Sequence, residues 1–350
     1  MKLKISVVIL FIFAFYLGVN AQVKFTENFD YTAGDSIGAH GWNANTGSTN
    51  NVLVVSPGLT YTGYPLSGIG NAARIKNYGI DYYKNFSGDS VTSGSVYTSF
   101  MIKIDTGKTG DYFFALLPMT STSNYYARVF AKDSSGTLSF GVSKYSTNTS
   151  NPSVYGPNGF NYGTTYLVIV KYKFNPGSSN DDDVSLFVFT SPSLPSTEPT
   201  TPYVGPVTTT QNDAISIGRN TLRQGSSSSS PTLNIDGIKS STSWAGIISN
   251  VKSISTVADK FALSQNYPNP FNPVTNINFS IPTSGNAKLS IYNALGQQVQ
   301  SLLNGSINAG TYSVQFNGKN LNSGLYFYKL ELSSNDGKYF SDVKKLMLVK

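Results

Sequence analysis

The chain has no cysteine and a single histidine, His40, and only 12% of its 350 residues are charged. Without cysteine no disulfide can form, and one histidine cannot supply the usual ligands of a tetrahedral zinc site. A catalytic serine needs a base within hydrogen-bond reach, and no G-x-S-x-G sequence marks such a serine. These absences exclude thiol, zinc and serine-triad chemistry of the usual kinds, and we expect His40 to be a polar loop residue.

Glutamate is also scarce, with Glu27, Glu198 and Glu331 as the only three. A glycosidase needs two carboxyl groups about 5–9.5 Å apart across the sugar bond. No Glu-x-Asp-x-x-Glu run offers such a pair, and Glu198 lies in a loop rich in proline and threonine. We therefore expect no enzyme, although a hydrolase or lyase that uses aspartate, tyrosine, lysine or arginine remains an alternative.

The formal net charge of +7 belongs mainly to the two ends of the chain. Two of the 25 basic residues precede residue 22, and from residue 257 onward eight lysines face four acidic residues. In between, 15 basic residues nearly balance 14 acidic ones. Binding to a phosphate backbone requires a basic patch, so we expect no nucleic-acid partner.

The first 21 residues have the composition of a secretory signal peptide. Lys2 and Lys4 form a short positive end, an apolar run extends from Ile5 to Val19, and small residues precede Gln22. The apolar run is shorter than the roughly 20 residues that a membrane-spanning helix needs. We expect cleavage before Gln22 and no transmembrane segment in the mature protein, with an uncleaved anchor as the alternative.

The remaining composition predicts an all-β protein of two domains. The chain has 32 Gly, 23 Tyr and 21 Phe, and aromatic residues favour strands while glycine favours turns. Alternating or apolar runs recur at short spacing, and no convincing amphipathic helix separates them. About ten such runs predict a jelly-roll β-sandwich over residues 22–255. The runs are Val23–Glu27, Val52–Val55, Ser95–Ile104, Tyr112–Leu117, Tyr125–Lys132, Leu138–Ser143, Tyr166–Phe174, Val184–Phe189, Ala214–Arg219 and Leu233–Lys239.

Five short sequences occur in the order found in a known group of secreted bacterial domains. They are "ENFDY", Gly41-Trp42, "DDDVSLFV" (Asp181–Val188), "LRQG" (Leu222–Gly225) and "IDGIKSSTSWAGI" (Ile235–Ile247). Together they resemble the laminin-G-like, or concanavalin-like, jelly-roll domains. The resemblance implies the fold and a loose association with glycan or surface binding, but a fold of this kind does not determine a function.

Calcium is the metal that this composition suits, because it prefers oxygen ligands from carboxylates, amides and backbone carbonyls. Glu27 and Asp30 lie at the first predicted strand, and Asp236 lies in a late one. The resemblance to jelly-roll modules implies a structural calcium ion that ties these strands together, with Glu27, Asp30 and Asp236 as ligands. In the alternative interpretation, Glu27 and Asp236 bind only loop amides. We expect Asp181–Asp183 to form a solvated turn.

Aromatic residues in the long early loops could form a platform that stacks on sugar rings. We assign ligand binding to Trp42, Tyr61, Tyr64 and Tyr82, with packing in the core as the alternative for each. Tyr82 and Tyr83 are adjacent, so on a strand they point to opposite faces and only one can join a given platform.

The last 90 residues predict a second, smaller sandwich. The segment "NYPNPFNP" (266–273) contains three prolines, which fix φ and remove hydrogen-bond donors, so it cannot be a central strand. We expect a lead-in segment with Phe271 buried beneath it, followed by alternating strands. Residues 261–350 then form a seven-strand Ig-like sandwich of the usual size, after a linker at 256–260.

This region closely resembles the C-terminal sorting domain of type IX secretion cargo. The resemblance rests on "NYPNPFNP", "IYNALGQQV", "AGTYSVQF", "LNSGLYFYKL" and "KKLMLVK", in that order. The region is also similar to the Ig-like domain of flagellar hook-capping proteins. The sorting residues it implies are Pro268, Pro270, Phe271, Pro273, Gly296, Gly310, Gly324, Lys344 and Lys345. It further implies contact with the secretion machinery, export to the cell surface or beyond, and removal of the domain or its exchange for a lipid anchor.

From these patterns we expect a secreted, non-catalytic protein whose first domain binds a glycan or another surface polymer. A purely structural surface or matrix protein is the alternative, and a polysaccharide hydrolase or lyase is a third interpretation.

Overall fold

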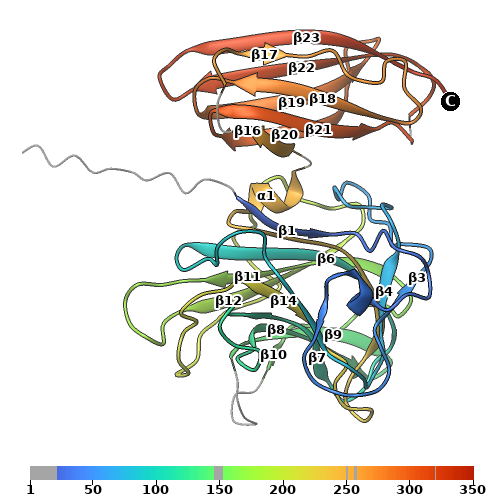
Figure 1. Cartoon of the computed structure of the whole chain (residues 1–350), viewed down its shortest axis with the longest axis vertical. Helices are drawn as coiled ribbons and strands as arrows, with labels where there is room; N and C mark the ends of the chain where they lie inside the picture. The colour runs from blue at the N-terminus through green and yellow to red at the C-terminus, as the bar shows by residue number, and fades with distance from the viewer. Residues whose placement is uncertain (1–21, 146–152, 250, 256–257, 320) are drawn as a thin grey trace, which may run out of the picture.

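The computed structural model describes residues 22–145, 153–249, 251–255, 258–319 and 321–350. The predicted signal peptide lies outside these ranges. Within them, no helix is long and apolar enough to cross a membrane. Figure 1 shows two units built almost entirely of strands, which confirms the all-β prediction.

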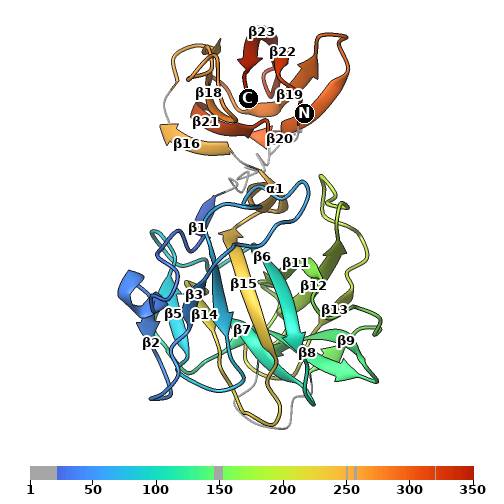
Figure 2. The ribbon, with the colours of Figure 1, turned by 90° about the vertical axis from the view of Figure 1, so that its right-hand side faces the viewer.

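The first unit is a sandwich of two antiparallel sheets (Figure 2). In the eight-stranded sheet the order is β13-β12-β11-β6-β15-β4-β3, and β1 pairs with β15. The seven-stranded sheet has the order β10-β9-β8-β7-β14-β5-β2. The strands of the first sheet are β1 (Val23–Glu27), β3 (Leu53–Val55), β4 (Ala72–Ile75), β6 (Ser95–Thr106), β11 (Thr165–Lys173), β12 (Asp183–Thr190), β13 (Val204–Val207) and β15 (Thr232–Ser241). Those of the second are β2 (Asn43–Ala44), β5 (Tyr82–Asn85), β7 (Asp111–Leu117), β8 (Tyr126–Ser134), β9 (Thr137–Tyr145), β10 (Val154–Tyr155) and β14 (Arg219–Leu222).

The core between the sheets follows from side-chain alternation. On β11, Val168 and Val170 enter the main core, while the intervening Leu167 and Ile169 join two separate apolar clusters. Successive strand residues point to opposite faces, so the second pair lies on the outer face of the eight-stranded sheet. The eight-stranded sheet is therefore apolar on both faces.

Loops and a short helix cover that outer face. Tyr61 and Tyr64, from the loop after β3, pack on Met101 and Leu167. Helix α1 (Trp244–Ile248), capped by the Ser243 hydroxyl, packs Trp244 against Tyr97 and Phe187. No equivalent layer of core residues is seen over the outer face of the seven-stranded sheet among the described residues, where only a small cluster around Tyr112 and Phe130 lies.

Most predicted strands of this unit are present, with one displacement. The run predicted at Ala214–Arg219 is replaced by β14, which begins at Arg219. Ala214 and Ile217 are buried, but only an isolated bridge from Ile217 to Val91 forms before β14. The apolar pattern there reflects burial of a loop and not a strand. The short strands β2, β4, β5, β10 and β13 were not predicted.

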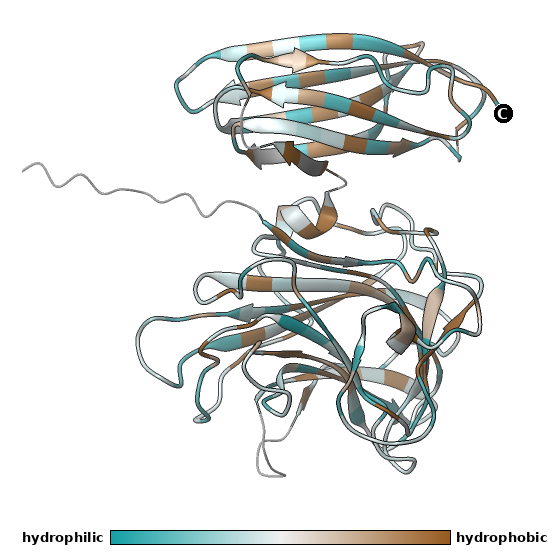
Figure 3. Ribbon diagram, viewed as in Figure 1, coloured by the Kyte–Doolittle hydropathy of each residue, from teal (hydrophilic) through white to brown (hydrophobic). Residues whose placement is uncertain are grey.

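The second unit is also a sandwich, with sheets β16-β21-β18-β17 and β20-β19-β22-β23. Figure 3 shows hydrophobic and hydrophilic residues alternating along its strands. The predicted inward residues Ile277, Phe279 and Ile281 are all buried. Strands β17 to β23 are the seven of the predicted Ig-like sandwich: β17 (Ala262–Leu263), β18 (Val274–Ile281), β19 (Gly285–Asn293), β20 (Gln298–Ile307), β21 (Gly310–Asn317), β22 (Gly324–Ser334) and β23 (Tyr339–Leu348).

An eighth strand, β16 (Val251–Ser255), adds to the edge of this second unit. Its backbone pairs with β21, with Val251 opposite Val314 and Ser255 opposite Thr311. The sequence predicts that residues 251–255 end the first domain, because they precede the predicted linker at 256–260. The pairing assigns them to the C-terminal sandwich.

The proline-rich lead-in segment is held against the last strand. Phe271 donates its N–H to the Met347 carbonyl (2.9 Å), and Val349 donates to the Phe271 carbonyl (3.0 Å). The Asn269 side chain accepts a bond from the Met347 N–H (2.9 Å). The Phe271 ring is buried in the core, as predicted. Pro268, Pro270 and Pro273 therefore flank a residue that joins the first and last parts of the sandwich.

The other predicted sorting residues lie in turns and on β23. Gly296 has φ +78° in the turn from β19 to β20, where L residues rarely fit. Gly310 and Gly324 begin β21 and β22. Lys344 lies 3.6 Å from Asp342, and Lys345 is exposed.

Candidate functional site

The chain contains only four arginines, and three of them lie on the outer face of the seven-stranded sheet. Arg128 is on β8, Arg219 begins β14, and Arg223 directly follows β14. Tyr83 of β5 and Tyr112 of β7 lie under these guanidinium groups. We call these five residues the arginine face.

Strand alternation explains why these side chains point outward. On β8, Ala127, Val129 and Ala131 belong to the main core, so Arg128 and Phe130 project to the other side. On β14, the buried Asn220 and Leu222 alternate in the same way with Arg219 and Thr221. Thr221 pairs directly with Tyr83, which places Tyr83 on the outer side too. Arg223 lies two residues after Thr221 and therefore points to the outer side as well.

The Tyr112 ring lies between two guanidinium groups. The central carbon of Arg223 is 4.1 Å from the ring centre, and that of Arg128 is 5.0 Å away. The Arg219 carbon lies 4.5 Å from the Tyr83 ring centre. Each contact is a cation–π pair, worth about 0.5–1 kcal/mol at an exposed site and more where water is excluded.

The three arginines differ in their counter-charges. Arg223 pairs with Asp111 at 2.7 Å and approaches Asp81 at 4.0 Å. Arg128 donates from Nε to the Ser143 hydroxyl (2.9 Å), and no ion pair of Arg128 or Arg219 occurs among the described residues. Arg128 is thus a half-buried cation without an acidic partner.

The ionisable groups beside the arginines are poorly suited to proton transfer near neutral pH. Burial raises the pKa of Tyr112, and it raises the pKa of Tyr125 to about 12. Burial alone would also raise the pKa of Asp111, but the Arg223 charge and hydrogen bond outweigh it and lower that pKa. Asp81 is buried, which raises its pKa, and it accepts bonds from Thr46 and the Gln224 N–H.

The four aromatic residues predicted to bind ligand lie elsewhere and are buried. Trp42, Tyr61, Tyr64 and Tyr82 are between 1% and 4% exposed, so their rings cannot stack on a sugar. Their polar atoms bind protein partners: for example, Tyr64 donates to the Gly237 carbonyl (2.7 Å). The structure corrects this assignment in favour of core packing. Tyr82 and Tyr83 do point to opposite faces, and Tyr83 is the one that faces outward.

Glu27 is occupied by protein donors. Its Oε2 accepts bonds from Lys84 (2.7 Å), Trp42 Nε1 (3.1 Å) and the Tyr31 hydroxyl (3.1 Å), and its Oε1 accepts the Phe29 N–H (3.0 Å). Oε2 is fully used and the Lys84 ammonium supplies its counter-charge, whereas Oε1 accepts a single bond. Glu27 is therefore a buried structural anchor held by protein donors, and its role as a calcium ligand stays a prediction.

Asp236 has a different environment. It is fully buried on β15 and accepts only the Leu59 N–H (2.7 Å) and the Gly237 N–H (2.6 Å). Burial raises its pKa to about 8. A Cβ added at Gly58 would meet Asp236 Oδ2 at 2.9 Å and the carbonyl oxygens of Gly70 (2.7 Å) and Asn71 (3.2 Å). Three oxygen atoms therefore surround one point beside Gly58.

The chain near Glu27 supplies further oxygen atoms. The Asn28 side-chain oxygen is buried without a hydrogen-bond partner. A Cβ added at Gly70 would meet the Asn28 carbonyl oxygen at 2.3 Å and the Asp30 backbone at 3.1 Å. The Asp30 side chain is exposed. Strand β1 pairs directly with β15, with Glu27 opposite Ile238, so the first strand and the strand that carries Asp236 are neighbours. Asn28 and Gly70 bring further oxygen atoms to the same region.

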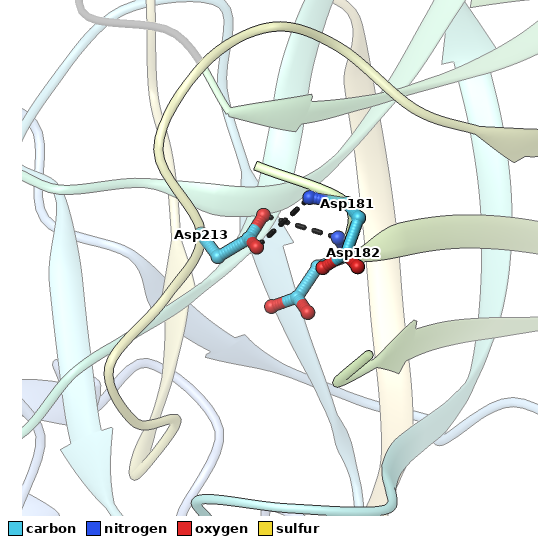
Figure 4. Close-up of side chains that lie close together, drawn as sticks. All are labelled: Asp181, Asp182 and Asp213. Atoms are coloured by element: carbon cyan, nitrogen blue, oxygen red, sulfur yellow. Dashed lines mark hydrogen bonds between the residues drawn. The ribbon is translucent and has the colours of Figure 1, made fainter. Parts of the chain in front are cut away.

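A second acidic cluster lies at the start of β12 (Figure 4). Carboxylate oxygens of Asp181, Asp182 and Asp213 lie within 4.8 Å of one another, a spacing that could hold a metal. Asp213 accepts the N–H groups of Asp181 (3.0 Å) and Asp182 (3.1 Å), and it pairs with the fully buried Lys144. Asp182 and Asp183 are buried, so the expected solvated turn is wrong. Lys144 already supplies a positive charge here.

The two units differ in what comparisons with known proteins reveal. Residues 265–347 match the family model of the secretion system C-terminal sorting domain. The C-terminal sandwich is a type IX sorting domain. The chain is therefore type IX cargo that contacts the secretion machinery, and the protein is secreted or lies at the cell surface. The lead-in segment held by β23 opens this sorting domain.

No curated protein matches the chain in sequence. Among solved structures, it is similar to a mutant of alginate lyase Aly36B in complex with alginate trisaccharide, with a TM-score of 0.41 and 14% identity over 62% of this chain and 97% of that one. It is also similar to the globular domain of T. cruzi calreticulin, with a TM-score of 0.39 and 11% identity over 65% of this chain and 91% of that one. A third similar structure is the CBM2 module of the evolved Dit of Lactobacillus casei BL23 phage J-1, with a TM-score of 0.33 and 12% identity over 63% of this chain and 96% of that one. These likenesses concern the fold alone.

Proposed function

We propose that this protein is a non-catalytic binding protein that type IX secretion delivers to the cell exterior, where the arginine face of its first unit binds a polysaccharide. The observation that carries the proposal is the contrast between the two outer faces. Loops and helix α1 cover the eight-stranded sheet, whereas Arg128, Arg219, Arg223 and Tyr83 remain partly exposed on the seven-stranded sheet. Aromatic rings combined with arginine forks suit sugar rings that carry polar groups.

Two observations favour binding over catalysis. The tyrosines near the arginines have raised pKa values, so near neutral pH they are protonated and cannot act as bases. The only acids that contact Arg223 are held by it and by neighbouring hydroxyl or N–H donors. His40 lies away from the face, stacked on Tyr31 and bound to Asp35 (3.0 Å). Among the described residues, neither a free carboxylate nor a histidine base therefore accompanies the arginines.

The test is a panel of neutral and acidic polysaccharides presented to residues 22–350, the chain without its predicted signal peptide and with its sorting domain, which we call the mature chain. Affinity electrophoresis measures binding, and reducing ends and ultraviolet absorbance of unsaturated uronate measure cleavage. We expect retardation by at least one polymer without release of products. Cleavage of any polymer contradicts the non-catalytic role, and no binding to the whole panel favours a purely structural surface protein.

We also propose a structural calcium ion beside Gly58. The oxygens of Asp236, Gly70 and Asn71 that lie close to Gly58 are of the kinds that calcium prefers. The unpartnered side-chain oxygen belongs to Asn28, whose backbone carbonyl lies close to Gly70. The ion would supply the positive charge that the buried Asp236 lacks. It would tie the two ends of the loop between β3 and β4 to strand β15.

A further inference from the structure

The arginine face carries more positive charge than its own acids neutralise. Asp81 and Asp111 both lie against Arg223, which leaves Arg128 and Arg219 without a carboxylate partner among the described residues. Lys132 adds a further cation, with its Nζ 4.1 Å from the centre of the Tyr155 ring. The imbalance is local, because the first unit as a whole has nearly equal numbers of basic and acidic residues.

Arg128 is the cation best prepared for an external anion. Its Nε is fixed by Ser143, and its guanidinium lies over Tyr112 and 5.2 Å from the centre of the Phe130 ring. A guanidinium has five N–H donors in a planar fork, and the bond to Ser143 uses one of them. The fork matches two oxygens of one carboxylate or sulfate, and partial burial strengthens such a pair.

The spacing of the arginines suits a polymer with repeated charges. Arg219 and Arg223 are four residues apart on an extended chain, which corresponds to roughly 13 Å at about 3.3 Å per residue. Arg128 approaches the Tyr112 ring from the neighbouring strand β8. A single small anion could engage one of these sites, whereas a chain of charged sugars could engage several.

We propose that the ligand of the arginine face is an anionic polysaccharide, and that Arg128 pairs with one of its carboxylate or sulfate groups. This inference rests on the proposed binding function and adds the ligand's charge class. Arg219 and Arg223 then contact other sugars of the same chain. The partly exposed Tyr83 ring supplies a stacking surface that does not depend on charge.

The experiment compares polymers that differ only in charge. Polygalacturonate is paired with its fully methyl-esterified form, and dextran sulfate with dextran, and single-stranded DNA serves as a non-sugar polyanion. The mature chain, Arg128→Gln, Arg128→Lys and the control Arg74→Gln are measured by titration at low and high salt. Arg74 is the fourth arginine and already pairs with Asp105 on the other sheet.

We expect binding to polygalacturonate, dextran sulfate or both, weakened by salt, and at least tenfold weaker binding to the uncharged partner. Arg128→Gln should reduce affinity about 10- to 100-fold, because a hydrogen bond to a charged group contributes about 1.5–3 kcal/mol. Arg128→Lys should recover part of the loss, and Arg74→Gln should match the parent. The melting temperature confirms that each variant is folded.

Three other outcomes would contradict the inference, each in a different way. Equal binding to charged and uncharged partners, unaffected by Arg128→Gln, overturns the charge class but leaves the proposed binding function. No binding to any sugar polymer overturns both. Tighter binding to DNA than to every polysaccharide also overturns both, since it makes the face a nucleic-acid surface.

Discussion

The Arg128 guanidinium lies 5.0 Å from the centre of the Tyr112 ring, so a cation that has no acidic partner among the described residues lies on an aromatic surface at the outer face of a sheet. Arg223 approaches the same ring at 4.1 Å. An aromatic ring held between two arginines fixes the direction of both guanidinium forks. This arrangement is the physical basis of the proposed binding function.

Tyr112→Phe should retain polymer binding, and Tyr112→Ala should lose it. Phenylalanine keeps the ring on which both guanidinium groups lie, whereas alanine removes it and lets the arginines turn into solvent. We expect a change within about threefold for the first variant and a loss of about tenfold or more for the second. Tyr339→Ala removes an exposed tyrosine of the sorting domain and serves as the control. Equal losses for Tyr112→Phe and Tyr112→Ala would show that the hydroxyl, not the ring, is needed.

Calcium should raise the melting temperature of the first unit. Saturation at about 100 times the dissociation constant adds about 2.7 kcal/mol, which for a domain of this size corresponds to roughly 5–10 °C. The shift should disappear on chelation and in Asp236→Asn, and it should shrink in Asn28→Ala. Asp181→Asn alters the second acidic cluster and is the matched control. A shift that survives in Asp236→Asn but not in Asp181→Asn would move the ion to the cluster of Figure 4.

Because of Lys239, the free energy of unfolding should depend on pH above neutrality. Its side chain is 5% exposed and donates to the Ser249 carbonyl, and burial lowers its pKa to about 8. The unfolded state keeps the proton up to a pH of about 10.4, so between about pH 8 and 10 it binds more protons than the folded state. The free energy of unfolding contributed by this group therefore rises with pH across that window.

Lys239→Met removes this dependence. At pH 7 we expect the variant to be more stable than the parent by about 1–3 kcal/mol, because burying the charge costs about 1.4 kcal/mol per unit of pKa shift. Denaturant unfolding at pH 7, 8, 9 and 10 should show the difference shrinking. A difference that stays constant over this range would mean that Lys239 keeps its ordinary pKa.

Phe271→Ala should destabilise the sorting domain by about 3–5 kcal/mol, since a fully buried ring is lost from the core. Tyr267→Ala, four residues earlier in the same segment, removes a ring that is 82% exposed and should change stability by less than about 0.5 kcal/mol. Thermal unfolding monitored by tyrosine fluorescence measures the loss of stability in each of the two variants. Comparable losses would show that the segment is stabilised by its backbone and not by Phe271.

The sorting domain was predictable because its strands alternate cleanly and its turns carry glycine. Ile277, Phe279 and Ile281 are inward at every second position, and the prolines exclude a central strand. Strand β16 was missed because nothing in Val251–Ser255 indicates which unit a five-residue strand joins. That choice depends on the free edge of β21, which is set by the tertiary fold.

The candidate site was harder to predict, because residue type does not reveal burial. Trp42 and Tyr61 lie in long loops, yet those loops pack Trp42 into the main core and Tyr61 over the outer face of the eight-stranded sheet. The sequence contains only a weak indication of the arginine face, since Arg128 and Arg219, two of only four arginines, lie in predicted strands. That Arg128 and Arg223 share one ring follows from the β7–β8 and β7–β14 pairings, which the sequence does not specify.

Arginine footprinting tests whether the arginine face is the surface on which the polymer binds. The mature chain is treated with phenylglyoxal with and without polygalacturonate or dextran sulfate, and modification at each of the four arginines is quantified by mass spectrometry. The account predicts that polymer slows modification of Arg128, Arg219 and Arg223 and leaves Arg74 unchanged. Unchanged modification of the three face arginines under conditions where polymer is bound would contradict it.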